Sequence, residues 1–305
     1  MENERASSGH KLGQLIGDWY EKYFVLPLLK AAADSLELYV DSRFIERTCR
    51  DSDKIIWNDI DGNSVDFDYV LELDGTDVTV GIPVAFIECF WRRGARHSKD
   101  KARDDSGKLM PMRDTYPTAR FLGIVSAGDF TTPARDLVKS RGIDLFYVPK
   151  DKIIESFSSC GLTIDYPDKT AESEKLSIVM AFEESFCDYK KQQVSSALMN
   201  LVGSASIKSY VSRLNSHLSA LPQEIRFILR HDSMPIIFES IHSASEFLIH
   251  PNFNMSDPVE SYVYQITYSD GTEFSKAVES IELLQDLHKQ ITLLAEHMNK
   301  LSTKT

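Results

Sequence analysis

The first part of the chain shows a helical pattern of apolar residues followed by strand patterns. Residues 12–40 carry large apolar side chains at helical spacing and predict a helix that Pro27 kinks or restarts. The charged residues 41–53 predict a connection. Residues 54–57 predict the first strand, which a hairpin turn at Asp61-Gly62 joins to the next strand.

Carboxylates lie within the next two predicted strands. In residues 65–73 polar and apolar residues alternate, so Asp66 and Asp68 share one face of the predicted strand. Residues 82–90 are too apolar for a one-sided sheet and predict a strand that is buried on both faces. Glu88 lies near the end of that strand. Because an unpaired buried carboxylate is costly, such a residue is usually paired, protonated or bound to a metal.

The elements that follow predict an α/β domain with a mixed sheet flanked by helices. They are a helix over 98–116 that Ser98 caps, a strand over 121–126, a helix over 131–140, a strand over 143–148 and a short helix over 150–157. Antiparallel strands followed by alternating helices and strands are typical of such a sheet. The first domain is expected to span residues 1–160.

The second half, residues 161–305, is expected to form a mostly α-helical accessory domain with a small β-hairpin. A polar linker over 161–173 precedes predicted helices over 174–202 and 205–220 and a third that begins at Pro222. Residues 260–268 alternate as a strand and turn into a short hairpin. This domain is expected to serve target recognition, oligomerisation or partner binding.

The last predicted helix, residues 275–301, carries apolar residues three or four apart, close to a heptad seam. One interpretation is a homodimer or a partner helix that packs on this seam. The other is packing of the seam on its own domain.

The composition of the chain predicts where the protein is located in the cell. The 305 residues are 42% hydrophobic, which gives enough apolar side chains for the cores of two domains. No apolar run is long enough to span a membrane, and the polar beginning of the chain is unlike a secretory signal. The four cysteines lie far apart without a C-x-x-C pair, so neither a zinc site nor a disulfide framework is indicated. We expect a cytoplasmic protein with no membrane partner.

The charge distribution places a basic segment directly after the strand that holds Glu88. The net charge of −12 argues against a general nucleic-acid coat protein. Residues 92–120 nevertheless hold nine Arg and Lys residues against four Asp residues. A solvated helix face is the ordinary interpretation of such a run, and its position after two acidic strands favours a surface that faces nucleic acid.

The order of these elements and acids resembles the PD-(D/E)XK nuclease superfamily, which has the restriction-endonuclease-like fold. That pattern is an acid on an N-terminal helix, an Asp on a strand, a strand that ends in Glu-x-Lys, and a closing strand, helix and strand. Glu21 or Asp18 would be the helix acid, Asp68 the strand acid and Glu88 the start of the third motif. The resemblance covers about residues 12–157 and depends on the order of the motifs and the 20-residue separation of Asp68 and Glu88.

The third motif departs from the family pattern, because it reads Glu88-Cys89-Phe90 with Phe in the place of Lys. Some members of the superfamily supply the Lys from the following helix. Lys101 and Lys99 are the candidates here, with Arg92 and Arg93 as other cations. Lys101 is preferred, because His97 and Lys101 are four residues apart and can share a helix face.

The resemblance implies a Mg²⁺-dependent DNA endonuclease that hydrolyses phosphodiester bonds. Mg²⁺, with Mn²⁺ able to substitute, would be held by Asp68, Glu88 and the carbonyl of Cys89. The DNA phosphates would meet Arg92, Arg93, Arg96 and His97, and a structural role is the alternative for His97. By analogy with the family, the protein would act in bacterial restriction or anti-phage defence, with a partner protein of a defence system.

Two alternatives remain at the level of the sequence. The first is a catalytically silent nucleic-acid-binding or interaction protein of the same fold, which the missing Lys of the third motif supports. The second is an α/β binding module unrelated to nucleases, in which Glu88 is a paired structural acid. Convergence of Glu21, Asp68 and Glu88 would favour the nuclease, and Asp68 and Glu88 on opposite faces would favour the unrelated module.

Overall fold

The structure, a computed structural model, describes residues 7–229, 232–249 and 261–303. Residues 1–6, on which part of the expectation about a secretory signal depends, lie outside the described residues, as does the predicted beginning of a strand at residue 260. No helix among the described residues is long and apolar enough to cross a membrane.

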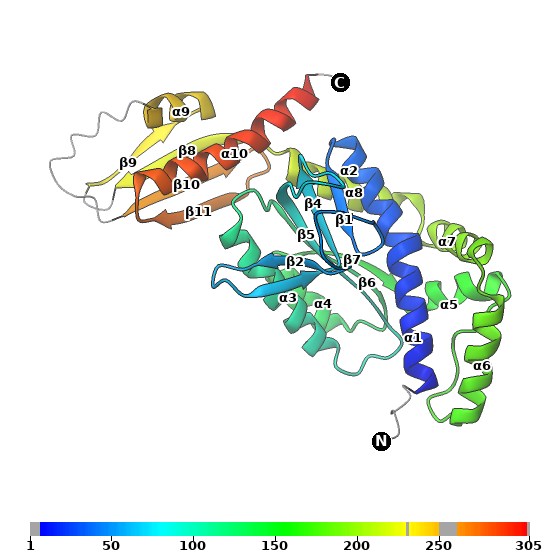
Figure 1. Cartoon of the computed structure of the whole chain (residues 1–305). Coiled ribbons are helices and arrows are strands. Elements are labelled where there is room, and N and C mark those ends of the chain that lie inside the picture. The colour runs from blue at the N-terminus through cyan, green and yellow to red at the C-terminus, as the bar shows by residue number, and fades with distance from the viewer. Residues whose placement is uncertain (1–6, 230–231, 250–260, 304–305) are drawn as a thin grey trace.

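A mixed five-stranded sheet lies at the centre of the molecule (Figure 1). Its order is β1-β4-β5-β6-β7, with antiparallel pairing across β1, β4 and β5 and parallel pairing across β5, β6 and β7. The strands are β1 (Tyr39–Ser42), β4 (Tyr69–Leu73), β5 (Ile82–Arg92), β6 (Phe121–Gly128) and β7 (Asp144–Pro149). Eight of the 11 residues of β5 are buried and the other three are half-buried, and all but Glu88 and Arg92 are apolar, as expected for a central strand covered on both faces.

The predicted strand over residues 65–73 is in fact two strands that separate at Asp68. β3 (Ser64–Phe67) pairs with β2 (Ile55–Asn58) as a two-stranded sheet of its own, whereas β4 belongs to the central sheet. The predicted hairpin turn between β2 and β3 is confirmed. The prediction missed β1, because a polar residue such as Asp41 suggests an exposed connection in the sequence. In the fold Asp41 is buried, and its Oδ2 lies 2.7 Å from Nη1 of the buried Arg47.

A continuous helical segment covers one face of the central sheet. It consists of α1 (Ser8–Trp19), a π-helical turn η1 (Tyr20–Val25) and α2 (Leu26–Ser35). Pro27 lies in the first turn of α2, directly after the π-helical turn, and the segment continues through it without a break. α5 (Lys150–Ser159) packs on the same side through Phe157, which contacts Trp19 edge to face.

The opposite face of the sheet is covered by α3 (Ser98–Thr115), α4 (Thr132–Ser140) and the β2–β3 hairpin. The two faces therefore have separate hydrophobic cores, one beneath the N-terminal helices and one beneath α3. The helix, strand, helix and strand predicted over residues 98–148 are confirmed. α3 begins at Ser98, and His97 holds the N-cap position that was predicted for Ser98.

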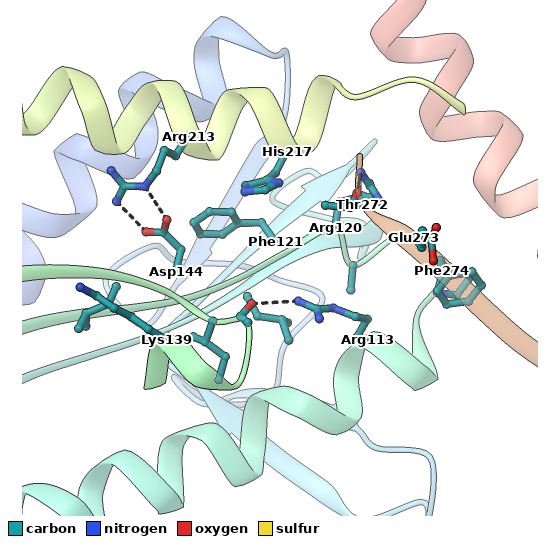
Figure 2. A pocket seen from close by; sticks show the side chains of 16 residues that line it. Arg113, Arg120, Phe121, Lys139, Asp144, Arg213, His217, Thr272, Glu273 and Phe274 are labelled. Carbon is teal, nitrogen blue, oxygen red and sulfur yellow. Dashed lines mark hydrogen bonds and ion pairs between the residues drawn. The ribbon is translucent and has the colours of Figure 1, made fainter. Parts of the chain in front are cut away.

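Three helices after the linker extend the first core. They are α6 (Glu172–Ser185), α7 (Asp188–Val202) and α8 (Ser204–Ser219), so the single helix predicted over 174–202 is interrupted at Phe186. Their buried residues join the core of α1 and α2, and Arg213 on α8 forms a two-pronged ion pair with Asp144 on β7 at 2.6 and 2.9 Å (Figure 2). The hydrophobic core thus does not divide at the predicted boundary of residue 160.

The second half is mostly α-helical, as predicted, and the predicted hairpin is present, but it belongs to a larger sheet than the sequence indicated. A four-stranded antiparallel sheet in the order β11-β10-β8-β9 forms there, with α9 and α10 packed on one of its faces. The elements are β8 (Pro222–Leu229), β9 (Asp232–Phe238), α9 (Ile241–Ile249), β10 (Tyr262–Tyr268), β11 (Glu273–Val278) and α10 (Ile281–Ser302). The helix predicted from Pro222 is a strand, because Ile225, Phe227 and Leu229 alternate toward the helices.

The apolar seam of α10 packs within the chain. Its first half lies on the second sheet, and Leu294 and Met298 reach the core of the N-terminal helices. The ring of His297 makes a 2.8 Å contact with the carbonyl of Leu36. Of the two interpretations of the seam, packing on its own chain is the one observed, and a homodimer through α10 would have to use another face.

Candidate functional site

Asp68 and Glu88 meet where β4 begins beside β5. Tyr69 pairs with Ile87 in the antiparallel register, so Asp68 lies one step further along, next to Glu88. The backbone N–H of Cys89 donates to Oδ2 of Asp68 at 2.6 Å. The bend that ends β3 thus turns the Asp68 carboxylate toward β5, and the predicted pair of strand acids is brought together.

Glu88 is a buried carboxylate with an incomplete set of partners. Its side chain is 2% exposed and lies between Phe86 and Phe90 on the face toward α3. Oε2 is 3.2 Å from Nζ of Lys108, whereas Oε1 has no hydrogen-bond partner within the part of the chain that the structure describes. Burial, and then the charges of Asp68 and Asp105, raise the pKa of Glu88 to about 8.

Glu21 reaches the same cluster from the π-helical turn η1. The extra residue in a π-helical turn shifts the side chains that follow it, and such turns are frequent at functional sites. Burial and the charge of Asp68 raise the pKa of Glu21 to about 7, although Arg43 opposes this by pairing with its Oε2 at 2.7 Å. Asp18 is the other candidate for the helix acid. Its Oδ1 also pairs with Nη2 of Arg43 at 2.5 Å, but its side chain is 56% exposed.

One face of α3 supplies two lysines to the cluster. Lys101, Asp105 and Lys108 are spaced four and three residues apart and point toward the sheet. Nζ of Lys101 is 2.6 Å from Oδ1 of Asp105, and Oδ2 of Asp105 has no hydrogen-bond partner among the described residues. Burial lowers the pKa of Lys101, but the charges of Asp105, Glu88 and Asp68 outweigh it and raise that pKa overall.

The other predicted cations lie outside the acid cluster. Lys99 and Arg96 are exposed on the surface. His97 has a left-handed backbone (φ 62°) at the start of α3 and contacts Asp100, and with Arg92 and Lys101 it lines a cavity of about 400 Å³. His97 and Lys101 therefore lie on the same side of α3, as their spacing predicted.

Arg93 is occupied by the linker after α5. Its guanidinium lies 3.9 Å from the ring centroid of Tyr166, donates to the backbone carbonyl of Tyr166 and pairs with Asp168 at 3.2 Å. A phosphate contact by Arg93, predicted from the sequence, would require the linker to release it.

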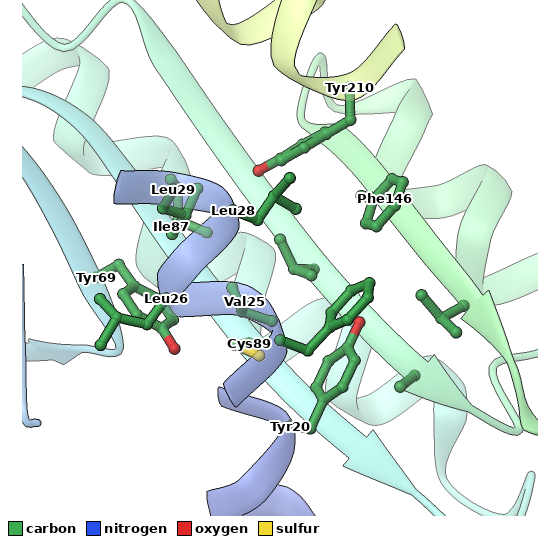
Figure 3. Close-up of a cluster of buried hydrophobic side chains, with 14 of the residues drawn as sticks. Tyr20, Val25, Leu26, Leu28, Leu29, Tyr69, Ile87, Cys89, Phe146 and Tyr210 are labelled. Carbon is green, nitrogen blue, oxygen red and sulfur yellow. The ribbon is translucent and has the colours of Figure 1, made fainter. Parts of the chain in front are cut away.

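Cys89 and Phe90 are both part of the hydrophobic cores. The Cys89 side chain points away from Glu88 into the core beneath η1, close to Tyr20 and Tyr69 (Figure 3). Burial raises the pKa of this thiol well above its usual value, so only its backbone is available to the acid cluster. Phe90 packs at 5.1 Å from Phe130, so the third-motif position holds a core residue.

The carboxylates of the acid cluster offer few side-chain ligands to a divalent cation. No group of three or more His, Cys, Asp and Glu side chains that could hold a metal ion is found among residues 7–229, 232–249 and 261–303. Mg²⁺, however, binds through only one or two carboxylates together with water and phosphate oxygens. The free Oε1 of Glu88 lies beside Asp68, and burial followed by the charge of Asp68 raises the pKa values of Glu88 and Glu21, which fits a cation of this type.

Comparisons with known proteins leave the geometry as the basis for any functional proposal. No family model matches the chain, and no curated protein and no solved structure matches it.

Sequence reasoning missed three members of the cluster, Arg43, Asp105 and Lys108. A signal existed for two of them, because Lys101, Asp105 and Lys108 recur at helical spacing within the predicted helix. No such signal exists for Arg43, which lies in a segment predicted as a connection and reaches Glu21 only through the tertiary fold.

Proposed function

We propose that the protein is a metal-dependent phosphodiester hydrolase that cleaves DNA internally. The observation that carries this proposal is the buried, half-unpartnered carboxylate of Glu88, which lies beside Asp68 and beneath two lysines of α3. Groups with strongly shifted pKa values that gather in this way are typical of functional sites. A role in restriction or anti-phage defence, with a partner protein, would be one use of this activity.

The residues of the cluster have distinct tasks in the proposed reaction. Asp68 and Glu88 would hold Mg²⁺ or Mn²⁺, together with the backbone carbonyl of Cys89. The bound cation would supply Lewis-acid stabilisation of the phosphate charge and a more acidic water. Lys101, which Asp105 fixes in place, would orient the attacking water and the phosphate, and the charge of Lys108 would favour the ionised form of Glu88 that binds the cation.

Glu21 has a supporting task. With a pKa raised to about 7, it can accept a proton from water near neutral pH and return it, which Asp18 at the surface is not placed to do. Arg43 fixes its orientation with two donors to Oε2, at 2.9 and 2.7 Å.

A catalytically silent nucleic-acid-binding protein is the second candidate. Phe90 in the place of the family's Lys, and the lack of a three-ligand cluster among the described residues, favour it. The two candidates differ in a single respect, which is whether Lys101 or Lys108 performs the task of the missing Lys.

The test compares the full-length protein with Glu88→Gln on supercoiled plasmid, single-stranded DNA and RNA, each with Mg²⁺, with Mn²⁺ and with EDTA. We expect metal-dependent cleavage of DNA by the wild type and none by Glu88→Gln. A matched control is Glu155→Gln, which changes an exposed glutamate on α5 and should keep full activity. Cleavage by Glu88→Gln would overturn the assignment, and DNA binding without cleavage by the wild type would establish the silent protein.

A further inference from the structure

A second polar cavity lies between the central sheet and the C-terminal sheet, at the amino ends of β6 and β7. Its volume is about 790 Å³, and it is bordered by α3, α4, α8 and β11 (Figure 2). Glu88 lies in the carboxyl half of β5, which runs parallel to β6 and β7, so the cavity and the acid cluster lie toward opposite ends of these strands. A cavity of this size is within the range of small-molecule sites.

The lining of this cavity is basic although the protein as a whole is acidic. Four arginines and lysines line it against two carboxylates. Two of these cations are balanced, because Arg213 pairs with Asp144, and Arg120 lies 3.4 Å from Asp270 at the rim. The remaining two cations, Arg113 and Lys139, form no ion pair within the part of the chain that the structure describes.

Arg113 and Arg120 are largely buried and incompletely satisfied. Arg113 donates to the backbone carbonyl of Gly142 at 3.3 Å, a long contact to a neutral group. The Arg120 side chain is 7% exposed, and its Nε has no hydrogen-bond partner among residues 7–229, 232–249 and 261–303. Burial lowers the pKa of both guanidinium groups.

The rest of the lining is apolar and aromatic. Phe121 and Phe274 contribute buried rings, and the imidazole of His217 lies 6.1 Å from the ring of Phe121. Figure 2 shows His217 above Phe121 on one side of the cavity and Arg113 on the other. Cations without a carboxylate partner match the oxygens of a phosphate group. The rings of Phe121 and Phe274 are too buried to offer a face to a ligand, whereas the His217 side chain is 38% exposed and its flat ring matches a nucleobase.

We propose that this cavity binds a nucleotide, with its phosphates on Arg113 and Lys139 and its base against the imidazole of His217. The cavity lies between the central sheet and the turn between β10 and β11, which Arg120 joins by donating to Thr272 at 2.8 Å. A bound nucleotide would therefore connect the two sheets and stabilise their arrangement. The proposal does not depend on the hydrolase activity, because it concerns binding alone.

The test is isothermal titration calorimetry of the full-length protein with ATP, GTP and inorganic pyrophosphate, in EDTA so that no metal occupies the acid cluster. We expect saturable binding of ATP or GTP at one site with a Kd below about 1 mM. Pyrophosphate should bind more weakly, because it has no base to contact the ring of His217.

Variants locate the binding to this cavity. Arg113→Gln should raise the nucleotide Kd at least about tenfold, the size expected for loss of a charge-assisted pair to phosphate. Lys139→Gln, at an exposed position where folding is not at risk, should raise it about threefold. Arg141→Gln, two residues from Lys139 and outside the lining, and Glu88→Gln in the acid cluster should both bind as the wild type does.

Three results would overturn the proposal. They are the absence of saturable binding for all three probes, wild-type affinity in both Arg113→Gln and Lys139→Gln, and displacement of bound ATP by a short DNA duplex. The last result would instead make the cavity part of the path of the nucleic acid.

Discussion

At the scale of single residues, the protein contains two buried glutamates with opposite surroundings. Glu72 receives two hydrogen bonds from Arg47, at 2.7 and 2.6 Å, and one from the N–H of Gly81 at 2.7 Å. Glu88 has one contact, to Lys108 at 3.2 Å, and a free Oε1 in the described structure. A fully partnered buried acid stabilises its surroundings, whereas an underpartnered one is kept at a cost in stability, which is typical of a residue retained for function.

This contrast predicts opposite changes in stability. Glu72→Gln should lower the free energy of unfolding by roughly 1–3 kcal/mol, because it removes one of the two carboxylates that pair with the buried Arg47 and leaves Asp41 as the other. Glu88→Gln should leave the free energy of unfolding unchanged or raise it, because it removes a repelled carboxylate. Urea denaturation of the metal-free variants at pH 8 measures both changes, and a loss of stability in Glu88→Gln would contradict its proposed role.

The lysines of α3 provide a second prediction at this scale. Lys101→Met and Lys108→Met should each reduce the single-turnover rate of DNA cleavage by roughly 10²- to 10³-fold, because each removes a cation directed at the acid cluster. Lys99→Met, on the exposed side of the same helix, should keep a rate close to that of the wild type. Equal rates for the three variants would remove α3 from the reaction.

At the scale of elements, the basic segment that includes α3 is divided by the fold. The face toward the sheet carries Lys101 and Lys108, while the segment that leads into α3 exposes Arg96 to solvent. Arg93, on the same segment, is held by Tyr166 and Asp168 of the linker. A run of basic residues in the sequence is therefore divided by the fold into site residues, solvent-facing residues and one structural ion pair.

The salt dependence of DNA binding distinguishes the solvent-facing residues from the structural ion pair. If DNA passes along this segment, Arg96→Gln should reduce the slope of log K against log salt concentration by about one, since one phosphate contact is lost. Arg93→Gln should leave the slope unchanged, because the linker already neutralises its charge. Fluorescence anisotropy with a DNA duplex in EDTA measures the slope, and the reverse order would mean that the linker releases Arg93 on binding.

The apolar seam of α10 could pack within the chain or on a partner, and the fold decides between the two. Ile291 is 2% exposed against the second sheet, whereas Leu293 is 40% exposed. Ile291→Ala should cost about 2–4 kcal/mol of folding free energy and leave the oligomeric state as it is, because the seam packs within the chain. Leu293→Ala should cost far less. Chemical denaturation and light scattering check these two outcomes, and dissociation of an oligomer by Ile291→Ala would show that the seam has a partner outside the chain.

At the scale of the whole molecule, pH and divalent cations should act on the same cluster. The pKa values of Glu21 and Glu88 are raised in the folded protein, to about 7 and about 8. A carboxyl group with a raised folded-state pKa stabilises the fold fully below its unfolded-state pKa, and this stabilisation is lost as the pH rises through the folded-state value. The metal-free protein should therefore lose stability between about pH 5 and pH 8.

Thermal unfolding across this pH range, with and without Mg²⁺, tests that prediction. Mg²⁺ should raise the midpoint temperature more at pH 8 than at pH 6, because it binds the ionised carboxylates. Glu88→Gln should flatten the pH dependence of the metal-free protein and remove most of the Mg²⁺ effect. A Mg²⁺ effect that is equal at both pH values would place the cation elsewhere.

The sequence by itself determined most elements of the first half and the pair Asp68 and Glu88. It could do so because strand and helix periodicities are local, and because a carboxylate within an apolar strand is conspicuous. The prediction for the last 85 residues was less successful, since β8 and β9 carry short apolar runs that fit a helix or a strand equally well.

Only the tertiary structure decided which charged residues meet. Arg43, Asp105 and Lys108 join the acid cluster, Arg93 is held by the linker, and the seam of α10 is covered by its own chain. The cavity with Arg113 and Arg120 likewise exists only because α8 and the β10–β11 turn close over the sheet. The physical reason is that these contacts join residues far apart in sequence, and their energies depend on burial, which no local pattern specifies.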